Sequence, residues 1–259
     1  MIELRDYRDK YSVARFERSG GILEITLQSP NGGPLVWGKE SHSQLGHLWA
    51  DVGADRDNEV IIVTGTGDAF IPSIDMSGVT IPGPEDWDEI MSNGKRIRRN
   101  LLAIEVPMIA AINGPARVHS EQGLLCDIVI ASEAADFQDA AHFINGLVPG
   151  DFVQAVYMSL LGNNRGRYFL YMGEIINAQD AKRLGLISEV VPAAGLMERA
   201  RTIARHIMKQ TRMVRKHTRA VTMDPWRRLY ADHHDMGTAL EALGIWGAAY
   251  PPSTKRRPF

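Results

Sequence analysis

Hydrophobic positions recur along this chain as short apolar runs separated by longer segments with helical spacing. The runs at 58–64, 108–114 and 126–132 are nearly continuous, which is typical of strands buried on both faces of a sheet. A further strand is expected at 22–27, directly after a glycine-containing turn. Strands that alternate with helices indicate an α/β layer fold with parallel strands.

The segments between and after these strands carry apolar residues three and four positions apart, as amphipathic helices do. A helix is expected at 39–52, and a longer one ends near Ile104 because Pro107 follows. Later helices are expected at 152–161, 165–172, 178–184 and 196–206 and in a C-terminal pair, with a short strand at 186–191. Residues 65–78 and 81–86 favour a loop and a linker, and 251–259 a loose tail.

Composition limits the classes of function. The chain has 259 residues, of which 44% are hydrophobic and 23% charged, so it can bury one sizeable core. Its net charge of −2 disfavours a nucleic-acid-binding or membrane-binding surface. The first residues are charged, and no apolar run is long enough to cross a bilayer. These features predict a cytoplasmic protein without a signal peptide.

Three chemical features have ordinary interpretations. Cys126 is the single cysteine and lies in an apolar run, which favours a buried, unreactive thiol. The basic residues within 209–219 have mixed helical spacing, which favours a solvated helix face over a phosphate-binding patch. No HExxH-type spacing occurs, and the adjacent His233 and His234 point apart on a helix, so no metal site is expected.

The segment FQDAAHFINGLVPGD carries the most informative candidate chemistry. His142 precedes a Val-Pro-Gly turn, and Asp151 directly follows that turn. The turn can fold the carboxylate back toward the imidazole, and a carboxylate that holds one tautomer makes histidine a better general base. The residues alone favour a packed core histidine and a turn aspartate over this catalytic pair.

Four segments resemble the crotonase (enoyl-CoA hydratase/isomerase) superfamily. They read IIVTGTGDAFIPSIDMS at 61–77, EVPMIAAINGPA at 105–116, CDIVIASEAADF at 126–137 and GEIINAQDAKRLGLISEVVP at 173–192. The resemblance implies the ClpP/crotonase-like α/β fold, with a core of repeated ββα spiral turns over 1–195. It also implies a C-terminal helical region over 196–259 that mediates trimers, which often pair into hexamers.

The departures from the hydratase pattern matter more than the matches. Where family members have a glycine run that helps to form the thioester oxyanion hole, this chain has Arg-Val-His-Ser, including His119. The other oxyanion loop has Pro72, which has no N–H to donate. His142 takes the place of one hydratase glutamate, whereas Glu121 retains the other. Together these changes disfavour hydration of a CoA thioester.

The pattern is more similar to 6-oxocamphor hydrolase and related β-diketone hydrolases, which cleave a carbon–carbon bond without CoA. The shared features are Trp37 in LVW, His42 five residues later, DWDEI at 86–90, the surroundings of His142, VPGD at 148–151, NRGRYFL at 164–170 and Glu241. This resemblance implies a retro-Claisen hydrolysis of cyclic or bicyclic β-diketones that gives a keto acid. The diketone supplies its own electron sink, so the reaction requires no metal, CoA or organic cofactor.

The resemblance also implies roles for individual residues. His142 is the candidate general base that activates water, with Asp151 orienting its ring. His119 and Trp37 are candidates to stabilise the oxyanion and the enolate through hydrogen bonds. Further candidates for substrate contact, for each of which a structural role is the alternative, are His42, Glu241, Phe70, Phe143 and Phe152.

Two other functions compete with this hypothesis. One is an acyl-CoA hydratase, isomerase or CoA-thioester hydrolase, which requires a working oxyanion hole despite the lost glycines. The other is a catalytically inactive, trimeric binding protein with the same fold. The joint presence of His119, His142, Asp151, Trp37 and Glu241 argues against an inactive protein, because a decayed site need not retain such a set.

Overall fold

The computed structural model describes residues 2–75, 77 and 83–249. Its main sheet has the strand order β1 (Ala14–Ser19), β2 (Ile22–Leu27), β4 (Val60–Gly65), β6 (Met108–Ile112), β7 (Ile128–Ser132) and β10 (Glu189–Val191). β1 and β2 are antiparallel, whereas each later pair of neighbours is parallel. The expected α/β fold with parallel strands is confirmed.

The first hairpin contains a strand that the hydrophobic pattern did not predict. β1 reads ARFERS and alternates buried and more exposed residues, with charged side chains outside. Gly20 and Gly21 form its two-residue turn, with φ values of 56° and 82°. Such left-handed conformations suit glycine, and a two-residue turn with both φ values positive matches the twist of a hairpin. The edge strand of the sheet is therefore β1, which precedes the predicted strand at 22–27.

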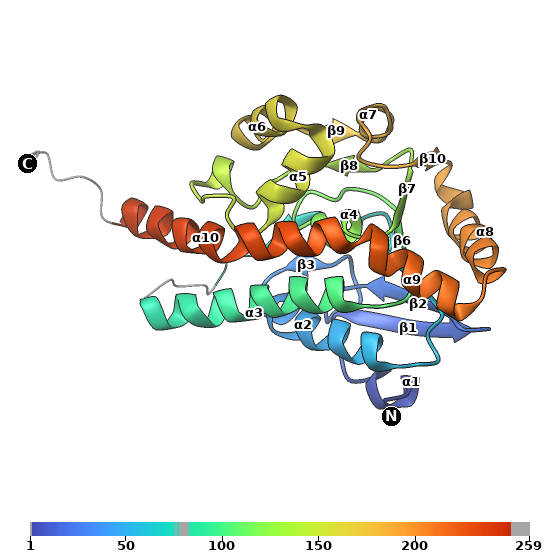
Figure 1. The fold of residues 1–259 in the computed structure, drawn as a ribbon. Helices are drawn as coiled ribbons and strands as arrows, with labels where there is room; N and C mark the ends of the chain where they lie inside the picture. The colour runs from blue at the N-terminus through green and yellow to red at the C-terminus, as the bar shows by residue number, and fades with distance from the viewer. Residues whose placement is uncertain (1, 76, 78–82, 250–259) are drawn as a thin grey trace, which may run out of the picture.

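The two faces of the sheet carry separate layers of the core. In β4 every residue is buried, and Val60 and Ile62 face the helix α8 (Leu196–Met208). The intervening Ile61 and Val63 face the main core, which includes residues of α2 (Lys39–Ala54) and α3 (Pro84–Ala103). Figure 1 shows α8 on one side of the sheet and α2 and α3 on the opposite side. Burial on both faces explains the continuous apolar runs.

The remaining elements surround this sheet. The short strands pair as β3 (Val36–Trp37) with β5 (Ser73–Ile74), in parallel, and β8 (Asp136–Phe137) with β9 (Ile176–Asn177), antiparallel. The helices are α1 (Leu4–Tyr7), α4 (Glu121–Leu124), α5 (Val153–Leu161), α6 (Asn163–Met172), α7 (Ala178–Leu184), α9 (Arg212–Thr222) and α10 (Asp224–Ala249), with the short 3-10 helices η1 (Phe143–Asn145) and η2 (Ala193–Gly195). None of the helices within the described residues combines the length and the apolar character that a membrane span requires.

The structure places the start of a helix inside one of the segments predicted to be irregular. α3 starts at Pro84, inside the predicted linker, because proline is well tolerated in the first turn of a helix. The predicted tail at 251–259, and residues 81 and 82 of the linker, lie outside the described residues.

The helix α9 corrects the expectation of a solvated basic face. Arg215 and Arg219 are buried and form ion pairs with Glu59 and Asp127, respectively. Lys216 also lies 2.6 Å from a carboxylate oxygen of Glu105. The basic side chains therefore attach α9 to the ends of the strands and to neighbouring loops.

The long helix α10 packs against α3 and α5 (Figure 1). It also makes a very close backbone contact with the turn that precedes α5. A Cβ atom added to Gly150 would lie 2.1 Å from the carbonyl oxygen of Gly237, and one added to Gly237 would lie 2.0 Å from that of Gly150. Neither position has room for a side chain. The contact brings Glu241, one turn along α10, next to the turn that carries Asp151.

Candidate active site

A group of polar and aromatic side chains from several elements meets between α3, α4 and α10. We refer to it as the polar cluster; its members are Trp37, His42, Arg98, His119, Glu121, Asp139, His142, Asp151 and Glu241. Three of the charged side chains, those of Arg98, Glu121 and Asp139, are no more than 2% exposed. Charges so deeply buried require partners, and the cluster supplies them.

His142 lies at the start of η1 and has a carboxylate on each side of its ring. Nδ1 lies 2.6 Å from Oδ1 of Asp139, which is a short hydrogen bond. Nε2 lies 3.5 Å from Oδ1 of Asp151 and 3.8 Å from Oε1 of Glu241. The sequence-based expectation that Asp151 orients the imidazole is therefore corrected: Asp139 holds the ring, and Asp151 faces the other nitrogen.

The carboxylates determine how His142 and Glu241 hold protons. Burial disfavours the imidazolium, but the negative charges of Asp151, Asp139 and Glu241 outweigh burial and raise the pKa of His142 to about 10. Burial, together with the charge of Asp151, raises the pKa of Glu241 to about 8. At neutral pH both groups therefore favour their protonated forms.

Asp151 is held in one orientation by contacts with both of its oxygens. Oδ2 accepts a hydrogen bond from Nη2 of Arg98, and Oδ1 accepts one from the backbone N–H of Val153 at 3.3 Å. Burial alone would raise the pKa of Asp151, but Arg98 and His142 hold it well below its usual range. Phe152, the next residue, has a φ of 89°, a left-handed conformation that turns the chain into α5.

His119 precedes α4 and presents one edge of its ring to the charged groups. Nδ1 lies 3.0 Å from Oε1 of Glu121, 3.3 Å from Nη2 of Arg98 and 3.4 Å from Oδ2 of Asp151. Because Nδ1 is engaged there, Nε2 is the ring nitrogen left for another ligand. The φ of His119 is 45°, so the chain keeps a conformation that suits glycine at this place while adding an imidazole.

Aromatic rings continue the cluster toward β3 and α2. The ring centroid of Trp37 lies 4.0 Å from that of His119 and 5.9 Å from that of His42. The rings of His119 and His142 are perpendicular, with their centroids 5.7 Å apart. Burial and then the positive charges of Arg98 and His119 lower the pKa of His42 to about 3, so His42 is neutral at physiological pH. The sequence-predicted set of Trp37, His42, His119, His142, Asp151 and Glu241 is thus brought together.

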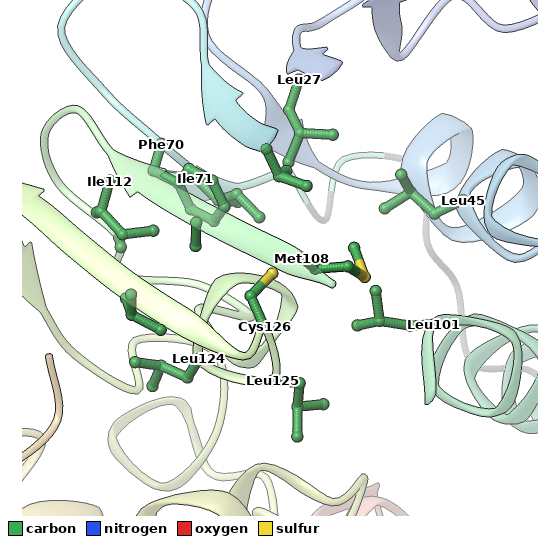
Figure 2. Packing of buried hydrophobic residues seen from close by; sticks show 14 of the residues in the cluster. Leu27, Leu45, Phe70, Ile71, Leu101, Met108, Ile112, Leu124, Leu125 and Cys126 are labelled. Atoms are coloured by element: carbon green, nitrogen blue, oxygen red, sulfur yellow. The ribbon is translucent and has the colours of Figure 1, made fainter. Parts of the chain in front are cut away.

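The three phenylalanines that the sequence suggested for substrate contact are not members of the polar cluster. Phe70 is fully buried in the main core, beside Ile71 and Ile112, as Figure 2 shows. Phe143 is 46% exposed and packs edge-on against Tyr171. These positions do not support the pocket-lining role expected for Phe70 and Phe143. Phe152 is buried next to Asp151 with its ring edge-on to Tyr230, which fits a core contact.

Sequence reasoning missed two members of the cluster. Asp139 stands three residues before His142, but nothing in its type or spacing separates it from an ordinary loop aspartate. Arg98 did leave a signal, because Gly94, Ile97 and Leu101 are the buried face of α3 and residue 98 falls on that face. A charged residue at a core-facing helix position indicates a buried partner.

Arg98 also bears on whether the cluster holds a metal ion. Within the described residues, His119, Glu121 and Asp151 offer ligand atoms that lie within 4.8 Å of one another. One guanidinium nitrogen of Arg98 contacts all three of these residues. The space that a cation would take is thus filled by a positively charged side chain.

Two surface clefts lie elsewhere. One, of about 340 Å³, is lined by residues of β1, β2, β4 and α8, including the ion pair of Arg201 with Glu24. The other, of about 420 Å³, lies beside α9 and includes Cys126, whose thiol pKa burial raises to about 12. Neither cleft includes a residue of the polar cluster, and neither pairs a base with an available nucleophile, so the polar cluster is the better candidate for chemistry.

Comparison with known proteins identifies the family. The family model for enoyl-CoA hydratase/isomerase matches residues 17–236. The chain belongs to the enoyl-CoA hydratase/isomerase family. This assignment confirms the crotonase fold that the four sequence segments predicted.

The proteins of similar sequence include CoA hydratases. The chain is 32% identical over 201 residues to an (E)-benzylidenesuccinyl-CoA hydratase from Thauera aromatica, covering 74% of each chain. It is 26% identical over 194 residues to a short-chain-enoyl-CoA hydratase from Clostridium acetobutylicum, again covering 74% of each.

Among solved structures, a β-diketone hydrolase from the cyanobacterium Anabaena sp. PCC 7120, bound to (S)-3-oxocyclohexyl acetic acid, is 40% identical. Its TM-score is 0.91, and the match covers 95% of this chain and 98% of that one. An enoyl-CoA hydratase/isomerase from Mycobacterium paratuberculosis, with 23% identity and a TM-score of 0.80, shows the shared fold alone.

Proposed function

We propose that this protein is a hydrolase that cleaves a carbon–carbon bond of cyclic or bicyclic β-diketones by a retro-Claisen reaction, which yields a keto acid. The observation that carries the proposal is the surroundings of His142 Nε2. That nitrogen faces Asp151 at 3.5 Å and Glu241 at 3.8 Å. Polar contacts of this length suit a bridging water molecule better than a direct hydrogen bond.

In the proposed reaction, neutral His142 takes a proton from this water, and the hydroxide attacks one carbonyl carbon. Asp139 keeps the proton of Nδ1 in place and stabilises the imidazolium that forms. The tetrahedral oxyanion then expels the neighbouring carbon as the enolate of the second carbonyl. The imidazolium of His142 returns its proton to the enolate carbon. One water molecule is consumed, and a carboxylic acid and a ketone result.

His119 and Trp37 are proposed to stabilise the two oxygens on which negative charge develops. Each side chain offers one N–H donor. The two rings pack against each other, with their centroids 4.0 Å apart, and this contact fixes their positions. Preorganised donors in a site that excludes water are effective because they need not reorient during the reaction. The 40% identity to the Anabaena β-diketone hydrolase supports the same substrate class.

The relatives favour a CoA-thioester hydratase as the alternative. In this chain Glu121, the retained hydratase position, is fully buried and is bound to Arg98 and His119. A carboxylate engaged in this way is poorly placed to activate water on a thioester. Titration calorimetry with a CoA thioester distinguishes the two functions, because only the hydratase requires tight binding of CoA.

The direct test is a steady-state assay on monocyclic and bicyclic 1,3-diketones, in which loss of diketone absorbance is followed and the keto acid is identified by mass spectrometry. We expect turnover by the wild-type protein and none by His142→Ala. A folded protein that cleaves no member of such a panel would rule the proposal out.

A further inference from the structure

The polar cluster contains one fixed positive charge, the guanidinium of Arg98. Arg98 is 1% exposed, and its Nη2 contacts Asp151, Glu121 Oε1 at 3.1 Å and His119 Nδ1 at 3.3 Å. Its Nη1 donates to the backbone oxygen of Gly94 at 3.3 Å, which ties the guanidinium to its own helix. One side chain of α3 thus connects groups that lie 21 to 53 residues away in the sequence.

The charges around Arg98 explain why the site needs this cation. The carboxylates of Asp151 and Glu121 share one guanidinium nitrogen, and both are buried. Two buried carboxylates so close together cannot both stay ionised without a positive charge between them. Without Arg98, one of the two carboxylates would have to take up a proton to balance the charge.

We propose that Arg98 is a positioning residue of the diketone hydrolase, which neutralises Glu121 and Asp151 together and fixes the Asp151 carboxylate with Oδ1 toward His142. The proposal rests on the proposed function for its effect on catalysis. Arg98 binds Oδ2, so only Oδ1 remains to hold a water molecule at Nε2 of His142. An Asp151 that is free to rotate, or is protonated, would lose that water contact.

The pH dependence of Asp151 reflects every ionisable group that faces it. From the surrounding elements these are Arg98 of α3, His119 and Glu121 at α4, His142 at η1, Glu241 and His234 of α10, and His42 of α2. Arg98 supplies the largest of the opposing effects that keep the pKa of Asp151 low against burial. Removing Arg98 should therefore raise that pKa more than any other single change.

The test compares Arg98→Met with Arg99→Met, the same substitution at the exposed neighbour on α3. For Arg98→Met we expect kcat/KM to fall about 100-fold, as misplacement of a catalytic group does. We also expect a new acidic limb in its pH profile, because Asp151 now titrates. Arg99→Met should keep the wild-type rate and profile. Wild-type kinetics in folded Arg98→Met would overturn the proposal.

The double variant Arg98→Met/Glu121→Gln separates charge balance from packing. Because it removes the second carboxylate, Asp151 should ionise more easily, and we expect the acidic limb to move back toward lower pH. A role of Arg98 in packing alone predicts no such relief, so an unchanged limb would contradict charge balance. If Arg98→Met does not fold, Arg98→Lys is the deciding variant. Lysine keeps the positive charge but lacks the planar guanidinium, so we expect an unchanged pH profile and a lower kcat/KM. A wild-type kcat/KM in Arg98→Lys would overturn the positioning role.

The ionisation of Asp151 can be measured without substrate, so the role of Arg98 can be tested independently of the proposed function. Carbon-13 NMR of side-chain carboxyl-labelled aspartate, with Asp151→Asn for assignment, follows the ionisation of Asp151 directly. We expect Asp151 to remain ionised to below pH 4 in the wild type and to titrate at a higher pH in Arg98→Met. If no diketone is cleaved, the proposed function fails while this titration still tests Arg98. An equal titration in both proteins would overturn the proposal.

Discussion

Nδ1 of His142 lies 2.6 Å from Oδ1 of Asp139, and both side chains are almost fully buried. This short contact leaves Nε2 as the ring nitrogen that faces Asp151 and Glu241. A buried carboxylate on Nδ1 fixes the tautomer of a histidine and raises its basicity at Nε2. Asp139 and Asp151 thus have different relationships to the same imidazole, and substitutions should distinguish them.

Asp139→Asn tests the orienting carboxylate. The amide keeps the shape of the side chain but loses the charge that favours the imidazolium, and it permits the wrong tautomer. We expect kcat to fall about 1,000-fold or more, in line with orienting carboxylates in other histidine-dependent hydrolases. Asp180→Asn is the matched control, because the Asp180 side chain on α7 is 45% exposed and lies outside the polar cluster, and it should retain wild-type kcat. A kcat within threefold of wild type for Asp139→Asn would show that the orienting contact is dispensable.

Asp151→Asn tests the carboxylate that faces the proposed water. We expect most of kcat to be lost while the circular dichroism spectrum stays that of the wild type, because the amide has the same size. The melting temperature should fall, since Arg98 loses one of its two buried carboxylate partners. Retained turnover in this variant would remove Asp151 from the mechanism.

Much of the fold followed from the hydrophobic pattern. The strands β4, β6 and β7 are buried on both faces, so apolar character alone located them. The edge strand β1 was missed because its outward residues are charged and only every second position is buried. The basic helix α9 was misjudged for another reason: its partners Glu59 and Asp127 lie far away in the sequence.

For the polar cluster, the sequence indicated most of the residues but not the contacts between them. His119, His142, Asp151, Trp37 and Glu241 were found because each matched a pattern of residue types along the chain. The partners of these residues depend on distances between elements, which residue types do not specify. Asp151 and Arg98 are 53 positions apart, and only the packing of α3 beside the start of α5 brings them together.

The pH profile of catalysis should report the proton on His142. The carboxylates raise its pKa to about 10, so the imidazolium predominates at neutral pH and cannot accept a proton from water. We therefore expect kcat/KM to rise with pH and to level off near pH 10. In Asp139→Asn the residual activity should level off at a lower pH, because one of the charges that raise the pKa is gone. Rates that are flat from pH 6 to pH 10 would contradict this role for His142.

The stability of the protein should fall as pH rises, whereas kcat/KM should increase. The folded-state pKa of His142, about 10, exceeds its ordinary value of 6.5, so its contribution to stability is complete below pH 6.5 and is lost as pH rises through 10. The raised pKa of Glu241 acts in the same direction between about 4.5 and 8. The melting temperature should thus decline from pH 6 to pH 10, and His142→Gln should flatten that decline. An equal slope in both proteins would show that other groups control it.

His119 permits a test that separates the backbone from the imidazole. Its φ of 45° costs about 1 kcal/mol for a residue with a Cβ, and glycine avoids that cost. Both His119→Ala and His119→Gly remove the proposed hydrogen-bond donor, so both should lose kcat to a similar extent. The two variants should differ in the free energy of unfolding measured in urea, with His119→Gly the more stable by up to about 1 kcal/mol. If His119→Gly instead retained wild-type kcat, the backbone conformation alone would suffice, and the imidazole would have no part in stabilising the oxyanion.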